Sequence, residues 1–261
     1  MLLEKKNAVI YGAGGAIGSA LARAFAREGA RVVLAGRTTG PLAALAKEIS
    51  AAGGAVETAQ VDALNEESVE QQAAALARKV GSIDVSFNVI SVPHVQGRPL
   101  VDLSVDDFAA PIMSYAKTHF LTARAAARHM APKRSGAILM MTTTPDRRAI
   151  PMVGPFGTAC AAIEAFAHTL AAEVGPKGIR VVCLRSTGSP ETPGVQRAFA
   201  DHAKANGVAP KEWLENYKRQ TMLRRLTTLE ELTNMAVFLA SDRASAVTGT
   251  AVNLTCGAIA D

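Results

Sequence analysis

The sequence predicts an α/β fold with one doubly wound parallel sheet and helices on both of its faces. Short apolar runs alternate with longer stretches whose apolar residues recur at helical spacing, from one end of the chain to the other. No Gly/Ser-rich linker and no internal repeat interrupts this alternation. Residues 1–261 are therefore expected to form a single domain.

The composition is that of a globular protein with a sizeable core. Of the 261 residues, 49% are hydrophobic and 20% are charged. The formal charge of +5 is spread along the chain, and nothing resembles a nucleic-acid-binding motif. A basic solvated surface explains this charge more simply than a nucleic-acid partner does, although an anionic cofactor or substrate would also suit it.

The chain shows neither a membrane segment nor a disulfide framework. Its N-terminus runs directly into the first apolar run, and no apolar stretch approaches membrane-spanning length. Cys160, Cys183 and Cys256 lie far apart and lack metal-like spacing. We therefore expect reduced thiols, no metal site, no membrane partner and a cytoplasmic location.

The first element is a strand, a Gly-rich turn and a helix without interruption, NAVIYGAGGAIGSALARAFAR from Asn7 to Arg27. Glycines in such a turn let the backbone approach a pyrophosphate, and the new helix points unpaired N–H groups and its positive dipole end at that charge. The glycine spacing departs from the commonest dinucleotide fingerprint. On this stretch alone, a structural turn without a ligand stays an alternative.

The second strand, 31–35, is followed by Arg37 and Thr38, at the place where a Rossmann fold meets the adenosine ribose. An acidic residue there would bind the ribose 2′-hydroxyl, whereas an arginine fork suits a 2′-phosphate. Arg37 therefore favours NADP(H) over NAD(H), the alternative being a surface arginine in a loop.

The later elements continue the alternation. Strands are expected at 55–61, 83–89, 137–141, 180–185 and 251–254, and helices at 41–52, 66–80, 108–130, 159–174 and 230–241. Residues 190–221 are polar and helix-prone, with interruptions at Gly207 and Pro210. This insertion after the sixth strand is expected to cover the cofactor cleft as a lid.

Along essentially its whole length the chain resembles a short-chain dehydrogenase/reductase. The resemblance rests on the opening turn YGAGGAIG, Asp62 after the third strand, Asn88 in FNVIS, AAIEAFAHTLAAEVGPKGIRV, STGSPET, and the tail LRRLTTLEELTNMAVFLASDRASAVTGTAVNL. It implies a seven-stranded Rossmann sheet, a nicotinamide cofactor, a small-molecule substrate, and a homotetramer or homodimer.

The resemblance also implies a set of cofactor contacts. These are Gly12, Gly15, Ile17 and Gly18 at the pyrophosphate, Asp62 and Ala63 at the adenine, Asn88 at the ribose side, and Gly188 and Thr192 at the carboxamide. Two positions, each next to one of these residues, depart from the family pattern. Ala16 replaces the second glycine, and Thr187 stands where proline is usual.

The catalytic positions of the family are largely changed. Phe156 stands at the tyrosine position and Cys160 at the lysine position, while Tyr115 replaces the helix asparagine. Thr143 aligns with the serine that polarises the substrate carbonyl, and it alone keeps its chemistry. Because a phenyl ring has no proton to donate, the usual alcohol/ketone mechanism requires another acid here.

Several residues are candidates for that acid or for substrate binding. Tyr115 could donate a proton from its hydroxyl, the alternative being a tyrosine of the core. His94 could act as an acid through its imidazole, the alternative being a histidine of a surface loop. Cys160 without a basic neighbour is expected to stay a protonated thiol. Arg147 and Arg148 are candidates to hold a carboxylate or phosphate, or they form an exposed charged loop.

Three functions are compatible with this pattern. The favoured one is an NADP(H)-dependent reductase with a non-standard active site, acting on a small carbonyl or enoyl substrate such as an acyl-CoA. Hydride transfer needs only a positioned nicotinamide and an acceptor carbon, and an enoyl acceptor tolerates loss of the tyrosine best. The alternatives are a catalytically silent subunit that pairs with an active sister, and a site redirected to non-redox chemistry.

Overall fold

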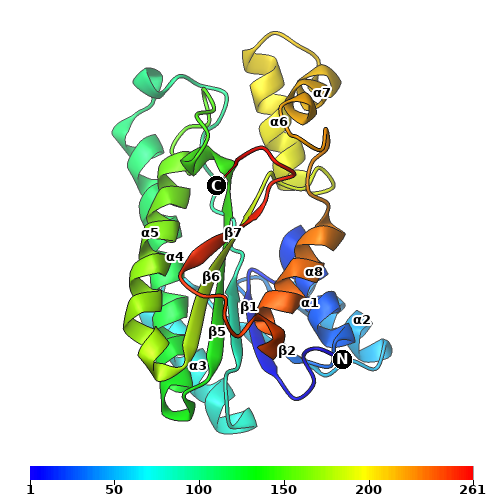
Figure 1. Ribbon diagram of the computed structural model, residues 1–261, viewed down its shortest axis with the longest axis vertical. Coiled ribbons are helices and arrows are strands. Elements are labelled where there is room, and N and C mark those ends of the chain that lie inside the picture. Colours follow the sequence, from blue (N-terminus) through cyan, green and yellow to red (C-terminus); the bar gives the residue numbers. More distant parts are fainter. Residues whose placement is uncertain (261) are drawn as a thin grey trace.

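The computed structural model describes residues 1–260 and contains one parallel sheet of seven strands in the order β3-β2-β1-β4-β5-β6-β7 (Figure 1). The strands are β1 (Asn7–Tyr11), β2 (Arg31–Gly36), β3 (Val56–Gln60), β4 (Val85–Asn88), β5 (Gly136–Thr143), β6 (Ile179–Ser186) and β7 (Thr250–Leu254). Strand order reverses between β1 and β4, where Tyr11 lies between Ala35 of β2 and Asn88 of β4. Ligands of doubly wound sheets bind at such a switch point.

Helices cover both faces of the sheet (Figure 1). One face is packed against α1 (Ala16–Arg27), α2 (Thr39–Ala51) and α8 (Leu229–Ala240). The other is packed against α3 (Glu66–Val80), α4 (Val105–Met130) and α5 (Phe156–Val174). A strand covered on both faces has no solvent side, which explains why the central strands read as continuous apolar runs. The predicted fold class is confirmed.

Two further helices lie beyond the end of the sheet (Figure 1). They are α6 (Pro193–Ala205) and α7 (Pro210–Arg219), within the segment predicted to be an insertion. Gly207, with a φ of +66°, follows α6, and Pro210 opens α7 at a position where its missing N–H costs nothing. The Tyr217 hydroxyl lies 3.1 Å from Thr144 Oγ1, which ties α7 to the end of β5.

Two helices begin earlier than the sequence pattern predicts because of their caps. Helix α4 begins at Val105, since Ser104 Oγ accepts a hydrogen bond of 3.0 Å from the Asp107 N–H. Pro111 lies inside this helix without ending it. Helix α8 begins at Leu229 because Thr228 and Glu231 form a reciprocal capping box.

The structure leaves the three thiols free. Cys160 and Cys183 are buried, and Cys256 is partly exposed. In the described part of the chain, no helix is both long and apolar enough to cross a lipid bilayer.

Helix α4 carries a histidine on its buried side. His119 is 2% exposed, and its Nδ1 lies 2.9 Å from the Tyr115 carbonyl oxygen. A carbonyl only accepts, so Nδ1 carries the proton, and the buried Nε2 has no partner among residues 1–260. Burial lowers the pKa of His119 to about 4, which keeps the folded imidazole neutral at neutral pH.

This depressed pKa predicts a pH-dependent loss of stability. An unfolded histidine takes up a proton near pH 6.5, whereas folded His119 does so near pH 4. The contribution of His119 to the unfolding free energy is therefore complete above pH 6.5 and is lost as the pH falls toward 4. We expect His119→Asn to remove about 2 kcal/mol of the decrease in unfolding free energy between pH 7 and pH 5. Urea unfolding at both pH values measures this, and an unchanged decrease in the variant would contradict it.

Candidate active site

The Gly-rich turn is built so that two of its glycines cannot be replaced without strain. Gly12 has a φ of +84° and donates its N–H to the Ala35 carbonyl at 2.9 Å. A Cβ on Gly18 would lie 2.3 Å from the Gly12 carbonyl oxygen and 2.7 Å from Ala13 Cα. The close approach of Gly18 to Gly12 therefore fixes how α1 leaves β1.

The N-terminus of α1 is open to an anion. Gly15 is its N-cap residue, no side chain caps the helix, and no acidic residue lies in its first turn. The first N–H groups of a helix have no intrahelical acceptor and carry the positive end of the dipole. Ile17 is partly buried against the core on this side, and Ala16 is half-buried. The backbone of this turn fits a pyrophosphate.

The ends of β2 and β3 carry the residues predicted to meet the adenosine. Arg37 and Thr38 are exposed, and in the described part of the chain the Arg37 guanidinium has neither a hydrogen bond nor an ion pair. The Asp62 carboxylate accepts from the Leu64 N–H at 3.0 Å, and Ala63 beside it is buried. Arg37 thus stands as an uncompensated cation next to the switch point.

The ends of β4 and β6 carry the remaining predicted cofactor residues. Asn88 is buried, donates to Thr122 Oγ1 at 3.1 Å and accepts from the Ile90 N–H at 3.0 Å. Gly188 has a φ of +82°, and the buried Thr192 is the N-cap residue of α6. Because carboxyl ends of parallel strands share one edge of the sheet, Asn88 and Gly188 lie toward the same edge as the Gly-rich turn after β1.

Thr143 and Cys160 face each other at the end of β5. Thr143 Oγ1 lies 3.9 Å from Cys160 Sγ, and Thr143 is half-buried while Cys160 is 1% exposed. Burial raises the pKa of the Cys160 thiol to about 12, so this thiol stays protonated. Cys160 therefore provides neither the charge of a lysine nor a thiolate nucleophile.

Three aromatic rings occupy the space around the tyrosine position. His94 stacks on Phe156 with ring centres 4.6 Å apart, and Tyr115 lies 5.7 Å from Phe156. The Tyr115 hydroxyl accepts from the Val92 N–H at 3.1 Å and donates to the Val92 carbonyl at 3.3 Å. Burial raises the pKa of Tyr115. In this arrangement the hydroxyl holds the loop after β4.

A polar relay joins this loop to α6. His94 Nδ1 donates to the Val92 carbonyl at 2.8 Å, so His94 Nε2 accepts from the Gln96 amide nitrogen at 2.7 Å. Gln96 Oε1 then accepts from His202 Nε2 at 3.0 Å. Burial lowers the pKa of both histidines, which keeps both rings neutral in this network. Both ring nitrogens of His94 are thus engaged.

A buried cluster of charges, not anticipated from the sequence, lies behind Thr143 and Cys160. Arg185 contacts Glu164 through two hydrogen bonds, of 3.0 Å from Nε and 2.5 Å from Nη2, and Thr142 donates to the same carboxylate at 2.7 Å. Asp146 Oδ1 lies 3.7 Å from Arg185 Nε.

Its two carboxyl groups titrate in opposite directions. Burial, and next the Glu164 carboxylate, raises the pKa of Asp146 to about 6. Although burial acts to raise it, the hydrogen bonds from Arg185 and Thr142 hold the pKa of Glu164 below its ordinary value. The signal in the sequence was a charged residue next to or within an apolar run, Glu164 in AAIEAFA and Arg185 at the end of VVCLR.

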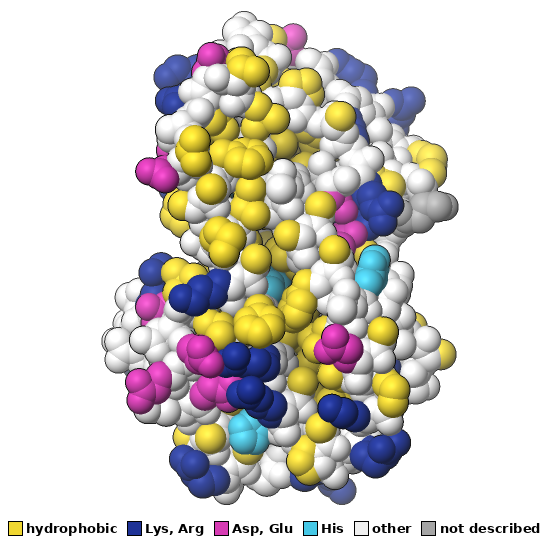
Figure 2. Space-filling view, turned by 90° about the vertical axis from the view of Figure 1, so that its left-hand side faces the viewer, with side chains coloured by type: hydrophobic (Ala, Val, Ile, Leu, Met, Phe, Trp, Pro, Cys, Tyr) yellow, Lys and Arg dark blue, Asp and Glu magenta, His cyan; other side chains and the backbone are white. Residues whose placement is uncertain are grey.

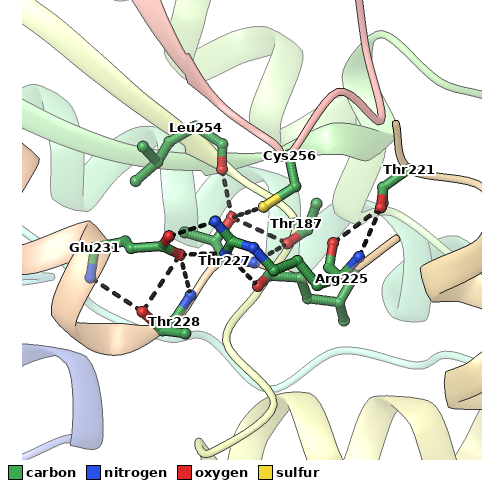
Figure 3. A network of polar contacts seen from close by, with 9 residues as sticks. Thr187, Thr221, Arg225, Thr227, Thr228, Glu231, Leu254 and Cys256 are labelled. Carbon is green, nitrogen blue, oxygen red and sulfur yellow. Dashed lines mark hydrogen bonds and ion pairs between the residues drawn. The ribbon is translucent and has the colours of Figure 1, made fainter. Parts of the chain in front are cut away.

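A second network anchors the chain where it returns from α7 to α8 (Figure 3). Thr227 Oγ1 donates to the Leu254 carbonyl at 2.5 Å, and the Thr227 N–H donates to Thr187 Oγ1 at 3.0 Å. Arg225 contacts Glu231 through two bonds of 2.8 and 2.6 Å. These contacts join the segment after β6, the start of α8 and the end of β7, and so fix the base of the 190–221 segment.

This fold and the Gly-rich turn at its switch point are those of a dinucleotide-binding α/β protein. The model of a family described as enoyl-(acyl carrier protein) reductase matches residues 12–258. The chain belongs to the short-chain dehydrogenase/reductase family, and the resemblance seen in the sequence is confirmed. It is an oxidoreductase-type member of that family.

Similar proteins of this family include enzymes with different substrates. The chain is 29% identical over 260 residues to a 3-oxoacyl-(acyl-carrier-protein) reductase of Chlamydia muridarum, with 98% of each chain covered. It is 28% identical over 259 residues to a 3beta-hydroxysteroid dehydrogenase of Mediterraneibacter gnavus, covering 95% of this chain and 93% of that one.

Solved structures of the family superpose closely on this chain. A gluconate 5-dehydrogenase from Burkholderia cenocepacia in complex with NADP and tartrate has a TM-score of 0.87 and 28% identity, covering 98% of this chain and 96% of that one. An NAD+-bound xylitol dehydrogenase has a TM-score of 0.91 and 25% identity, with 98% of each chain covered.

The close approach of Gly18 to Gly12 predicts a clear difference between two glycines of the same turn. We expect Gly18→Ala to lower the unfolding free energy by about 1–3 kcal/mol, because the added methyl group collides with backbone. Gly14→Ala is the matched control, since its Cβ would lie 3.4 Å from Pro41 Cβ, an ordinary contact, and should change stability by less than about 0.5 kcal/mol. Chemical denaturation of both variants measures the difference, and equal losses would count against this packing argument.

Proposed function

We propose that this chain is an NADP(H)-dependent reductase with a non-standard active site, acting on a small conjugated enoyl or carbonyl substrate. The observation that carries the proposal is the combination of an open, uncapped α1 N-terminus with the unpaired guanidinium of Arg37 at the end of the neighbouring strand. The first suits a pyrophosphate and the second a 2′-phosphate.

The cofactor preference rests on Arg37. Structures similar to this chain were solved with NAD+ and with NADP, so family membership alone does not select between the two cofactors. Gly12, Gly15, Ile17 and Gly18 would hold the pyrophosphate, with Arg37 and Thr38 at the ribose phosphate. The other contacts we propose are Asp62, Ala63, Asn88, Gly188 and Thr192.

Thr143 is the residue that we assign to the substrate oxygen. Thr143 is half-buried, and its hydroxyl contacts the protonated thiol of Cys160 at 3.9 Å, so we propose that it donates a hydrogen bond to a substrate carbonyl. When bound, the nicotinamide cofactor supplies hydride. Holding the carbonyl oxygen with a donor stabilises the negative charge that develops there.

The source of the proton decides which class of substrate the site can reduce. Phe156 has no proton to donate, and the hydroxyl of Tyr115 and the Nδ1–H of His94 are both bonded to the Val92 carbonyl. A ketone needs a proton delivered at the oxygen, whereas a conjugated enoyl group takes its proton at carbon, where water can provide it. The arrangement therefore favours an enoyl acceptor, with Phe156, Tyr115 and His94 forming one wall of the site.

We also propose that the protein is cytoplasmic and that residues 190–221 act as a lid over the cofactor cleft.

We further propose that the protein forms a homodimer or a homotetramer. Figure 2 shows hydrophobic side chains gathered on the face that α4 and α5 cover. On α4, Met113 is 65% and Phe120 45% exposed, and Phe120 contacts Phe166 of α5. An apolar face of this kind on two long helices suits a second copy of the chain.

The cofactor assignment predicts a selective effect at Arg37. We expect Arg37→Gln to weaken NADPH binding by at least tenfold, through loss of a charge-assisted bond to the 2′-phosphate, and to change NADH binding by less than about twofold. Arg27→Gln, at the far end of α1, removes an exposed charge away from the site and serves as the control. Calorimetric titration measures all three proteins, and equal losses for both cofactors would exclude the assignment.

The role of Thr143 predicts a loss of turnover without a loss of cofactor binding. We expect Thr143→Val to lower kcat about 100-fold on the best α,β-unsaturated thioester or ketone, because the oxygen loses its donor. Thr143→Ser should keep most of the activity, and NADPH affinity should stay unchanged in both variants. If the wild-type protein binds NADPH but reduces no acceptor of such a panel, the result favours a silent subunit over an enzyme.

A further inference from the structure

A small cavity lies between the loop after β5 and α7, outside the catalytic positions described above. Its volume is about 120 Å³, and it is lined by Arg148, Ala149, Ile150, Pro151, Trp213, Asn216, Tyr217 and Gln220. A water molecule takes about 30 Å³ of liquid, so the cavity has room for a group of several heavy atoms. None of the residues that line it is acidic.

Two of the side chains that line the cavity have buried N–H donors without a partner. Neither Arg148 Nη1 nor Trp213 Nε1 has a hydrogen-bond partner within the described residues 1–260. The Arg148 guanidinium lies over the Tyr217 ring, 5.2 Å from its centre, and the Trp213 ring stacks on His202. A buried donor that lacks an acceptor is costly, so the cavity is complementary to a group that accepts two hydrogen bonds.

The charge around the cavity favours a group with a single negative charge. The neighbouring Arg147 lies 3.8 Å from the Asp146 carboxylate, whereas Arg148 has no acidic partner in the described chain. One uncompensated guanidinium matches a carboxylate, which carries one charge and two acceptor oxygens. A phosphate monoester carries nearly two charges and suits this single cation less well.

The cavity is connected to the proposed catalytic residue through two contacts. The Tyr217 hydroxyl lies 3.1 Å from Thr144 Oγ1, and Thr144 directly follows Thr143 in the chain. The backbone N–H of Arg148 also donates to the Thr144 carbonyl at 2.9 Å. A group held by Arg148 is therefore placed relative to the hydroxyl that we assign to the substrate oxygen.

We propose that this cavity is the subsite for a substrate carboxylate, held by Arg148 and Trp213. This deepens the proposed reductase function and rests on it, because it specifies the acceptor as a small molecule that carries a carboxylate in addition to the carbonyl group that Thr143 holds. Arg148 and Trp213 then select the substrate, while the chemistry takes place at Thr143.

The experiment uses Trp213 as its own reporter, since the chain contains one tryptophan. We would titrate the purified protein with crotonate, with its neutral isostere crotonamide and with methyl phosphate, and follow the tryptophan emission. We expect a saturable change with crotonate, and binding at least tenfold weaker for crotonamide and for methyl phosphate. An equal response to crotonamide, or no saturable response to crotonate, would overturn the proposal, and equal binding of methyl phosphate would overturn the choice of carboxylate.

Variants of the two adjacent arginines provide the matched control. We expect Arg148→Gln to weaken crotonate binding at least tenfold, and Arg147→Gln, with the same loss of charge one residue away, to change it less than twofold. Arg148→Lys keeps the charge without the planar fork and should bind several-fold more weakly than wild type, which tests the site even if the glutamine variant does not fold. Equal weakening by the Arg147 and Arg148 variants would contradict a specific site.

A parallel NADPH titration separates this inference from the proposed function. Arg148→Gln should bind NADPH as the wild type does, because Arg148 is not among the proposed cofactor contacts. If the wild-type protein binds crotonate selectively but binds no NADPH, the carboxylate subsite stands and the reductase function fails. If it binds NADPH and not crotonate, the reductase function stands and the subsite fails.

Discussion

The approach of α1 to the end of β1 is the contact on which the rest of the molecule depends. With no side chain at Gly18, the first turn of α1 lies against the Gly12 carbonyl, at a distance that a methyl group would not allow. Strand β1 pairs with both β2 and β4, so the same turn lies at the switch point of the sheet. The open helix N-terminus, the unpaired Arg37 and the Asn88 amide take their relative positions from this junction, and these positions carry the proposed cofactor site.

The fold was predictable from the sequence because its signals are local. The alternation of apolar strands and amphipathic helices predicts a parallel sheet, and carboxyl-end residues of such a sheet meet at one edge. Most of the proposed cofactor contacts, in contrast, came from the resemblance to the family, and they stay predictions. Helix starts were predicted less well, since the cap at Ser104 extends α4 beyond its periodic apolar residues. The contacts between distant segments were not predictable. Gln96 and His202 are 106 residues apart, and nothing local in either stretch indicates their hydrogen bond.

In the active site that we propose, the residues at the changed positions pack against one another. The tyrosine position is taken by Phe156, which packs into an aromatic cluster with His94 and Tyr115, and the lysine position by the buried thiol of Cys160. A lysine ammonium at position 160 would be near the Asp146, Glu164 and Arg185 cluster, where Arg185 already provides the positive charge. In the site that we propose, Thr143 is therefore the one polarising hydroxyl and no proton donor of the usual kind is present, which is why we propose acceptors that take their proton at carbon.

The most direct test of this account is calorimetric titration of the wild-type protein with NADPH and with NADH. The open turn at Gly12–Gly18 and the unpaired Arg37 predict binding of both cofactors, with NADPH at least tenfold tighter, a difference of about 1.4 kcal/mol. Tighter binding of NADH would contradict the role of Arg37. Binding of neither would mean that the Gly-rich turn serves only to join β1 to α1, and the proposed reductase function would be wrong.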